Sequence, residues 1–284
     1  MAQTQTDLPL AGVRVVSLAP NLPGPLAAAR LQAMGATVTK VEPPTGDQFS
    51  QVAPDWYAEL VAGQEVVALD LKDPDGRAAL ETRLAGADVL LTSMRPSALA
   101  RLGLPESAER HGLLLVEIVG YDGDREEEAG HDLTYQAVRG TLQPPAMPPV
   151  PWVDVLGSER AVSATLAGLR RRDAAGGSVR ERVVLDDVAH DAAAAVRHRL
   201  STPGAVLGGG LPAYGVYATA DGHVAVAAIE PHFARRLASA VGSTREELAA
   251  AFAGGTNEHW EALGRSLDIP IAAVRTPPAE GGPR

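Results

Sequence analysis

The stretch "EEEAGHDLTYQAVRG", residues 126–140, places the pair His131 and Asp132 directly after an acidic run and a glycine. The pair either lies in a solvated turn or presents an imidazole to a bound ligand. Imidazole titrates near neutral pH and is therefore well suited to general acid–base catalysis. Asp132 alone fits the N-cap of a following helix equally well, and Glu126–Glu128 fit a solvated loop. The residues alone leave these alternatives open.

Other patterns for known chemistries are weak or missing. Asp186 and His190 are four positions apart on a predicted helix, but a third ligand at matching spacing is missing, so no metal site is predicted. The sequence contains no G-x-S-x-G elbow and no glycine-rich phosphate loop of the two common types. It also contains no cysteine, which excludes disulfides, thiolate zinc sites and cysteine nucleophiles.

The composition is that of an ordinary soluble protein with an acidic surface. The 284 residues are 45% hydrophobic, and the formal net charge is -10. Such a surface repels nucleic acid and anionic lipid, so neither is expected as a partner, and a polyanionic ligand would need local positive charge. The N-terminus lacks the pattern of a signal peptide and no long apolar run occurs, so a cytoplasmic protein is expected.

Short apolar runs alternate with helical patterns through the first two thirds of the chain. This alternation predicts an α/β fold, Rossmann-like, with a mostly parallel sheet. The predicted strands are residues 13–19, 37–42, 66–72, 88–93, 113–120 and 180–186, and the predicted helices are residues 24–36, 73–87, 157–172 and 187–200.

Proline and glycine mark the expected divisions of the chain. Residues 141–153, which include "LQPPAMPPVPWV", are too rich in proline for a helix or a central strand and predict a connector. The segment 201–215 favours a domain boundary, and a β-hairpin around Asp221-Gly222 follows it. We therefore predict a large domain over residues 1–205 and a smaller α+β domain over residues 206–284.

Several segments together carry a family resemblance, in this order: "LAGVRVVSLAP", "MGATVTKVEPP", "VALDLKDPDGRAAL", "ADVLLTSMRPSALARLGL", "AGHDLTY" and "TADGHVAVAAIEPHF". They resemble the CaiB/BaiF family, which contains the class III CoA-transferases and their racemase relatives. The resemblance implies a Rossmann-like large domain, a small domain that is shorter here than in other members, a homodimer, and an acyl-CoA thioester as substrate.

Within this family the "GHD" triplet is typical of alpha-methylacyl-CoA racemases, which implies that His131 is the catalytic base. Asp154, in "PWVDVLGSERA", matches the second acid–base group of the racemases and the acyl-accepting nucleophile of the transferases. Glu230, in "AIEP", matches a carboxylate near the racemase site. The resemblance also implies that substrate or CoA is bound by Lys40, Leu69, Asp70, Leu71, Lys72, Arg95, Gly130, Asp132, Leu133, Thr134 and Tyr135. CoA is part of the substrate, and no separate cofactor or metal is implied.

These residue types suit inversion of the carbon next to a thioester carbonyl. One group must remove the proton on one face while a second group delivers a proton on the other. A neutral imidazole and a carboxylic acid with a raised pKa can exchange these functions near neutral pH. Stabilisation of the enolate oxygen must assist them. We expect Asp154 to precede a helix whose free N–H groups serve that oxygen, and Gly130 to permit close approach of the ligand.

Three alternatives to a racemase remain open. Asp154 could carry an acyl group in a CoA-transferase. The protein could also be a family member without activity that acts as a binding partner. Finally, other members have a basic stretch before the "ALDL" strand where this chain has Gln64 and Glu65, so the acyl carrier could be smaller than CoA.

Overall fold

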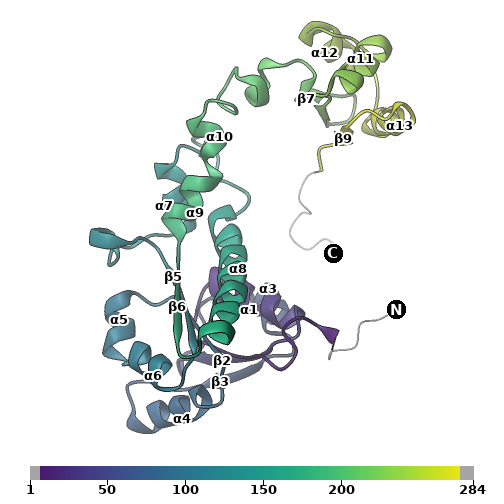
Figure 1. Cartoon of the computed structure of the whole chain (residues 1–284). Coiled ribbons are helices and arrows are strands. Elements are labelled where there is room, and N and C mark those ends of the chain that lie inside the picture. The colour runs from purple at the N-terminus through teal and green to yellow at the C-terminus, as the bar shows by residue number, and fades with distance from the viewer. Residues whose placement is uncertain (1–6, 276–284) are drawn as a thin grey trace. The chain divides into compact units, whose positions relative to one another are not determined.

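The computed structural model describes residues 7–275, which divide into two compact units (Figure 1). The first unit ends at Ala193 and the second begins at Ala194, whereas the sequence analysis placed the boundary after residue 205. Within residues 7–275 no helix combines the length and the apolar character that crossing a membrane requires.

The first unit is built on a six-stranded parallel sheet. Its strands are β1 (Arg14–Ser17), β2 (Thr37–Glu42), β3 (Glu65–Ala68), β4 (Val89–Thr92), β5 (Leu114–Val119) and β6 (Val179–Val184). Their order in the sheet is β3-β2-β1-β4-β5-β6, and every neighbouring pair is parallel. This is the doubly wound order of Rossmann folds, and it confirms the α/β prediction.

Helices connect these strands and cover both faces of the sheet. They are α1 (Pro23–Ala33), α2 (Phe49–Val52), α3 (Pro54–Val61), α4 (Pro74–Leu84), α5 (Pro96–Arg101), α6 (Leu104–Arg110), α7 (Asp132–Val138), α8 (Trp152–Ala175) and α9 (Leu185–Ala192), with a short 3-10 turn at Gly123–Arg125. Because parallel strands need a crossover connection, the helices between two strands return the chain to the start of the next strand, whereas α9 follows the last strand, β6.

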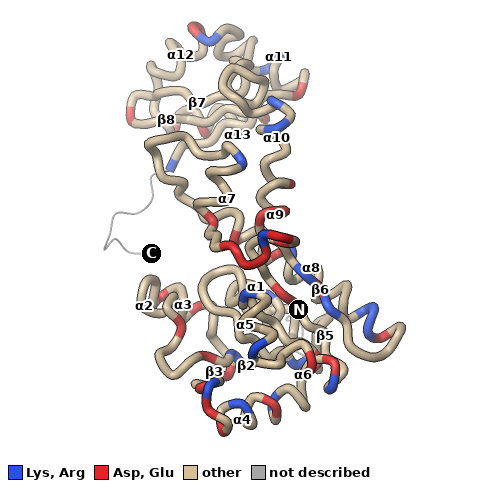
Figure 2. Tube along the Cα trace, turned by 90° about the vertical axis from the view of Figure 1, so that its left-hand side faces the viewer, with Lys and Arg blue, Asp and Glu red and all other residues tan. Residues whose placement is uncertain are grey.

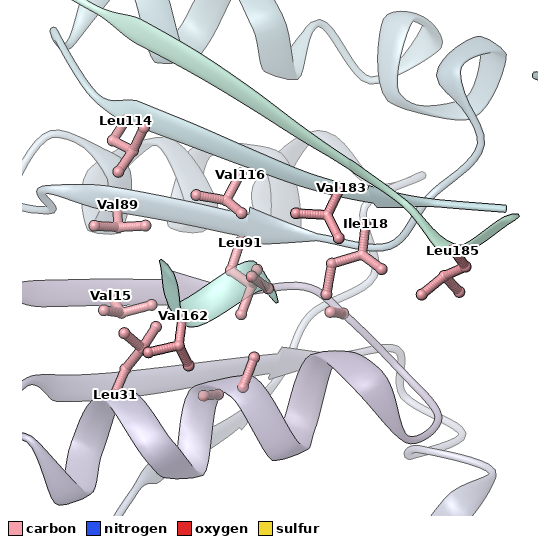
Figure 3. Close-up of a cluster of buried hydrophobic side chains, with 14 of the residues drawn as sticks. Val15, Leu31, Val89, Leu91, Leu114, Val116, Ile118, Val162, Val183 and Leu185 are labelled. Carbon is pink, nitrogen blue, oxygen red and sulfur yellow. The ribbon is translucent and has the colours of Figure 1, made fainter. Parts of the chain in front are cut away.

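Two hydrophobic cores lie on the two faces of the sheet because side chains alternate along each strand. On one face, β-strand residues such as Val15 and Leu91 pack against Leu31 of α1 and Val162 of α8 (Figure 3). On the other face, their strand neighbours pack against apolar residues of α4, α5 and α6. All six residues of β5 are buried, as expected for a central strand covered on both sides.

The strand order changes direction between β1 and β4. The chain first moves outward from β1 to β3 and then crosses to β4 on the opposite side of β1. The loops that follow β1 and β4 therefore diverge at the carboxyl edge of the sheet, and such a point is where ligands bind in open α/β folds.

Two predicted boundaries differ from the structure. The strand predicted over residues 66–72 ends at Ala68, and residues 69–72 form a turn in which the Asp70 carboxylate accepts a hydrogen bond from the Lys72 N–H. The helix predicted from residue 157 begins five residues earlier, at Trp152, directly after a proline that presets the helical backbone angle. Asp154 therefore lies within the first turn of this helix rather than before it.

The second unit contains a small antiparallel sheet with its own core. Its elements are α10 (Ala194–Arg197), a π-type turn (Val206–Gly210), β7 (Tyr214–Ala218), β8 (His223–Ala227), α11 (Pro231–Ala240), α12 (Arg245–Ala253), α13 (Asn257–Leu267) and β9 (Ile271–Ala273). The strands are ordered β7-β8-β9, and β7 and β8 form the predicted hairpin. Phe252 and Trp260 pack edge to face in the core of this unit.

Candidate active site

Two cavities lie at the carboxyl edge of the parallel sheet and share the residues Pro20, Asn21 and Ser93. These shared residues follow β1 and β4, so the cavities meet where the strand order reverses. The smaller cavity has a volume of about 240 Å³ and the larger one about 620 Å³. The smaller one is lined by Pro20, Asn21, Pro23, Ser93, Arg95, Ile118, Gly120, Glu128, Ala129, Gly130, His131, Tyr135, Asp154 and Leu185. An elongated ligand could therefore extend from one cavity into the other.

His131 reaches the smaller cavity from the N-cap of α7. Its backbone is extended and its side chain is exposed. The hydroxyl of Thr134 accepts a hydrogen bond from the His131 N–H at 3.0 Å and donates one to the His131 carbonyl at 2.8 Å. Thr134 thereby fixes the backbone from which the exposed imidazole projects.

The acidic loop before His131 is solvated, as expected, since Glu127 and Glu128 are exposed and Glu126 is half-buried, but polar contacts also anchor it. Each of its three glutamates has a polar partner. Glu126 pairs with Arg182 at 3.0 Å, and Glu128 pairs with Arg125 at 2.9 Å. Glu127 accepts hydrogen bonds from the backbone N–H of Ser97 at 2.7 Å and from its hydroxyl at 2.8 Å. Blue segments on β6 in Figure 2 mark arginines of this strand. The loop that carries His131 is thus held to β6 and to the start of α5.

Asp154 reaches the same cavity from the first turn of α8. Burial and, second to it, the negative charge of Asp132 together raise the pKa of its carboxyl to about 7. At neutral pH the protonated and ionised forms are therefore present in comparable amounts, as a group that both accepts and delivers a proton requires.

Asp132 holds the start of α8. Its Oδ1 accepts hydrogen bonds from the N–H groups of Val153 at 2.7 Å and Asp154 at 3.3 Å, and its Oδ2 accepts one from Gln136 at 2.6 Å. Asp132 is buried and does not line either cavity. The N–H groups of Val153 and Asp154 therefore already donate to Asp132. These two groups of α8 are not free to donate to an enolate oxygen, contrary to the expectation from the sequence.

Asp154 should make folding stability depend on pH. An unfolded aspartate has a pKa of about 3.9, whereas that of Asp154 is about 7 in the folded protein, so the folded state binds this proton more tightly. The free energy of unfolding should therefore decrease as the pH rises from about 4 to about 7. Asp154→Asn removes the buried charge and should raise the free energy of unfolding at pH 8 by up to about 4 kcal/mol. Urea unfolding of both proteins at pH 4 and pH 8 measures this effect. An equal difference at the two pH values would contradict it.

Tyr135 fills the space beside the two glycines of the site. A Cβ on Gly130 would lie 2.3 Å from the Tyr135 hydroxyl oxygen, and a Cβ on Gly120 would lie 2.5 Å from it. The Tyr135 hydroxyl thus leaves no room for a Cβ on Gly130, which also lines the smaller cavity, so the expectation that this glycine permits close approach of a ligand stays a prediction. Tyr135 lines the smaller cavity, and its buried hydroxyl has no hydrogen-bond partner among residues 7–275. Burial raises the pKa of this phenol, so it stays protonated and able to donate.

The larger cavity contains the predicted "LDLK" segment. Leu69, Asp70, Leu71 and Lys72 all line it, and Arg101, which the sequence analysis did not single out, adds a second cation. Apolar residues such as Leu18, Val41 and Met94 supply much of the remaining wall. The cavity therefore offers apolar surface together with the cationic side chains of Lys72 and Arg101, beside the carboxylate of Asp70, and phosphates on an apolar or aromatic body could pair with those two cations.

Lys40 also lines the larger cavity, but its ammonium group is held by protein carboxylates. It lies 2.7 Å from the Asp47 carboxylate and 3.2 Å from that of Glu42, and all three side chains are buried. Asp47 in turn accepts a hydrogen bond from the Asn21 N–H, and Glu42 accepts one from the Tyr57 hydroxyl. This network fixes the loop after β2 against the loop after β1, where Asn21 adopts a positive φ of 65°.

Two further predicted site residues of the first unit do not line these cavities. Leu133 and Thr134 are exposed on α7, and Glu230 is the exposed N-cap residue of α11 in the second unit. Asn21 and Ser93 were not predicted from the sequence, although Ser93 is the last residue of the predicted strand 88–93 and Asn21 lies two residues after the predicted strand 13–19. Within residues 7–275 no group of three or more His, Cys, Asp or Glu side chains could hold a metal ion.

Comparisons with known proteins give this geometry a context. The model of CoA-transferase family III matches residues 10–280. The alpha-methylacyl-CoA racemase of Mus musculus is 32% identical over 264 residues, which cover 84% of this chain and 66% of that protein, so the chain spans just under two thirds of this relative's length. The succinyl-CoA:glutarate CoA-transferase of Homo sapiens is 29% identical over 182 residues, which cover 57% of this chain and 41% of that protein.

A solved structure supports the fold. The crystal structure of a CaiB/BaiF family protein from Brucella suis matches with a TM-score of 0.80 and 21% identity, and the match covers 95% of this chain and 84% of that one. The family resemblance that the sequence segments carried is therefore confirmed. The chain belongs to CoA-transferase family III.

Proposed function

We propose that the protein is an acyl-CoA racemase or epimerase that inverts the α-carbon of a 2-methylacyl-CoA thioester by proton transfer. The observation that carries this proposal is that His131 and Asp154, from α7 and α8, line one small cavity. Two acid–base groups from different elements can stand on opposite sides of a bound carbon, whereas two groups from one turn would share a side.

The proposed reaction uses the two groups in alternating functions. In one direction the His131 imidazole removes the α-proton and the Asp154 carboxylic acid delivers a proton to the opposite face. In the other direction the Asp154 carboxylate is the base and the His131 imidazolium is the acid. A carboxyl pKa of about 7 suits this exchange because neither protonation form of Asp154 is rare near neutral pH.

The enolate oxygen also needs a hydrogen-bond donor, and Tyr135 is the candidate. Tyr135→Phe removes the hydroxyl while the ring keeps its contacts with Gly120 and Gly130. We expect kcat for exchange of the α-proton to fall by about 10²–10³, the usual effect of losing one preorganised donor. The KM for the thioester should change much less. An unchanged kcat would show that the donor lies elsewhere.

The larger cavity suits the rest of an acyl-CoA. It adjoins the smaller one at Pro20, Asn21 and Ser93, so a pantetheine arm could pass between them, and Lys72 and Arg101 could pair with phosphates. CoA is then part of the substrate rather than a separate cofactor. The homodimer and the cytoplasmic location expected from the sequence belong to this proposal as well.

A CoA-transferase is the second candidate. The relative from Homo sapiens named above is a transferase, and Asp154 is the carboxyl group that would carry the acyl group. A nucleophilic carboxylate must be ionised when it attacks, however, and burial keeps a large fraction of Asp154 protonated at neutral pH. This observation supports the racemase as the first candidate.

One experiment separates the two candidates. A single enantiomer of a 2-methylacyl-CoA is incubated with the protein in deuterated water and followed by NMR and chiral analysis. Deuterium at the α-carbon together with loss of enantiomeric purity is the expected result. Exchange of CoA to an added free acid, with an acyl group on Asp154 that hydroxylamine releases, would instead favour the transferase. If the protein catalyses neither reaction with any CoA thioester, both candidate functions are excluded.

A further inference from the structure

A third cavity, with a volume of about 410 Å³, is lined by residues of α4, α5 and α6. It shares Leu71, Arg101 and Leu102 with the larger cavity, and none of its lining residues lines the smaller one. A ligand in the larger cavity can therefore extend one end into the third cavity while its other end reaches the candidate acid–base groups.

The charged residues of the third cavity favour an anion. Three arginines line it, Arg77 of α4, Arg101 at the end of α5 and Arg110 at the end of α6. Two carboxylates oppose them, those of Glu81 and Glu106, so the lining residues carry an excess of one positive charge. On a chain with a net charge of -10, such a local excess is where an anionic group is attracted.

Glu81 and Arg110 neutralise each other and are not available to a ligand. Arg110 lies 3.0 Å from the Glu81 carboxylate, and the His111 imidazole lies 3.0 Å from the same oxygen. The Ser107 hydroxyl donates a hydrogen bond to the other oxygen. This cluster leaves Arg77 and Arg101 as the cations that can meet an anion in the cavity.

Arg77 is the cation that belongs to the third cavity alone. Its exposed guanidinium donates a hydrogen bond to the Leu102 carbonyl at 3.4 Å, and in the part of the chain that the structure describes it forms no ion pair. Because Leu102 lies on the shared wall, this contact keeps Arg77 beside the passage between the two cavities. Arg101 lies on the same wall, although its charge also acts on Glu127.

A CoA thioester has more phosphate than the larger cavity can pair. Its nucleotide carries a pyrophosphate and, on the 3′ carbon of the ribose, a phosphate monoester with a charge of about −1.5 to −2 at neutral pH. Lys72 and Arg101 are the two cations of the larger cavity that protein carboxylates do not hold, and the pyrophosphate alone occupies them. The monoester needs a further cation at the edge of that cavity.

We propose that the third cavity is a phosphomonoester site in which Arg77 binds the 3′-phosphate of CoA, so that this phosphate sets the choice of acyl carrier. The inference rests on the proposed function, because it assumes that the nucleotide lies in the larger cavity. Arginine suits the contact since its planar guanidinium can donate two parallel hydrogen bonds to one phosphate. A smaller carrier without this phosphate leaves Arg77 without its partner.

The test compares CoA with 3′-dephospho-CoA, which lacks only this phosphate. Dissociation constants for both are measured by titration calorimetry with the wild-type chain, Arg77→Gln and Arg83→Gln. Arg83 is the matched control, since it lies on the same helix but pairs with Glu65 at 3.7 Å and lines neither cavity. We expect the wild-type protein to bind CoA about 10-fold more tightly than 3′-dephospho-CoA, as one charge-assisted contact provides.

The variants show whether Arg77 makes this contact. Arg77→Gln should weaken CoA alone and bring the ratio of the two dissociation constants close to one, and Arg83→Gln should keep the wild-type ratio. A wild-type ratio near one, or equal weakening of both ligands by Arg77→Gln, would overturn the inference. Inorganic phosphate that binds through Arg77 while the ratio is near one would assign the cavity to a free anion instead.

Deuterium exchange tests the racemase separately. Absence of exchange together with an Arg77-dependent ratio would remove the proposed function and keep the phosphate site. Exchange in a protein whose ratio is near one would keep the function and remove the site.

Discussion

Replacement of either His131 or Asp154 is expected to lower the rate of racemisation about 10²–10⁴-fold, the contribution of one positioned acid–base group. His131→Ala removes the exposed imidazole from the N-cap of α7 but keeps both hydrogen bonds between the Thr134 hydroxyl and the backbone of residue 131, so the helix should remain. Asp154→Asn keeps the shape of the side chain but cannot exchange a proton. Initial rates of racemisation of both enantiomers, measured by chiral chromatography, give the size of each effect.

Matched controls keep these losses specific. Asp173→Asn changes an exposed aspartate on the same helix as Asp154, and His198→Ala changes an exposed histidine of the second unit. Both controls should retain the wild-type rate. A rate for His131→Ala within a few-fold of the wild-type rate would contradict the assignment of the imidazole as an essential base.

Replacement of Lys40 by methionine is expected to destabilise the first unit by about 3–5 kcal/mol, because it leaves two buried carboxylates without their counterion. Asp47 and Glu42 lie 2.7 and 3.2 Å from the ammonium group, and Lys40 itself is only 2% exposed. The midpoint of urea unfolding should fall accordingly. The loop that carries Asn21 should also loosen, since Asp47 holds its backbone N–H.

Lys72→Met is the matched control for this prediction. Lys72 lines the same cavity as Lys40 but is exposed, so its loss leaves no buried charge. Its variant should unfold at nearly the wild-type midpoint, although it should bind CoA thioesters less tightly. Equal stability of both variants would show that the buried network contributes little.

The parallel sheet could be predicted because its strands are short, apolar and separated by helical segments. The six buried residues of β5 and the four of β4 are nearly continuous apolar runs in the sequence. The order of the strands could not be predicted in the same way, since pairing depends on contacts between residues far apart in the chain. The meeting of the loops after β1 and β4, and hence the place of Asn21 and Ser93, follows from that order.

The two candidate acid–base residues were predictable from the sequence, but their surroundings were not. The family resemblance pointed to His131 and Asp154, and the structure places both at one cavity. It could not show that Asp132 is buried and holds the start of α8, because that contact joins residues 21 and 22 positions apart. It also could not show that the Tyr135 hydroxyl lies so close to Gly130 that a Cβ there would clash with it.

The central claim is that His131 and Asp154 act on opposite faces of one carbon. The most direct test is the rate at which each pure enantiomer of a 2-methylacyl-CoA takes up deuterium, measured by ¹H NMR for the wild-type chain, His131→Ala and Asp154→Asn. The wild-type protein should exchange both enantiomers, His131→Ala should lose exchange of one, and Asp154→Asn should lose exchange of the other. The claim would be contradicted if both variants lost exchange of the same enantiomer, or if neither variant lost exchange of either enantiomer.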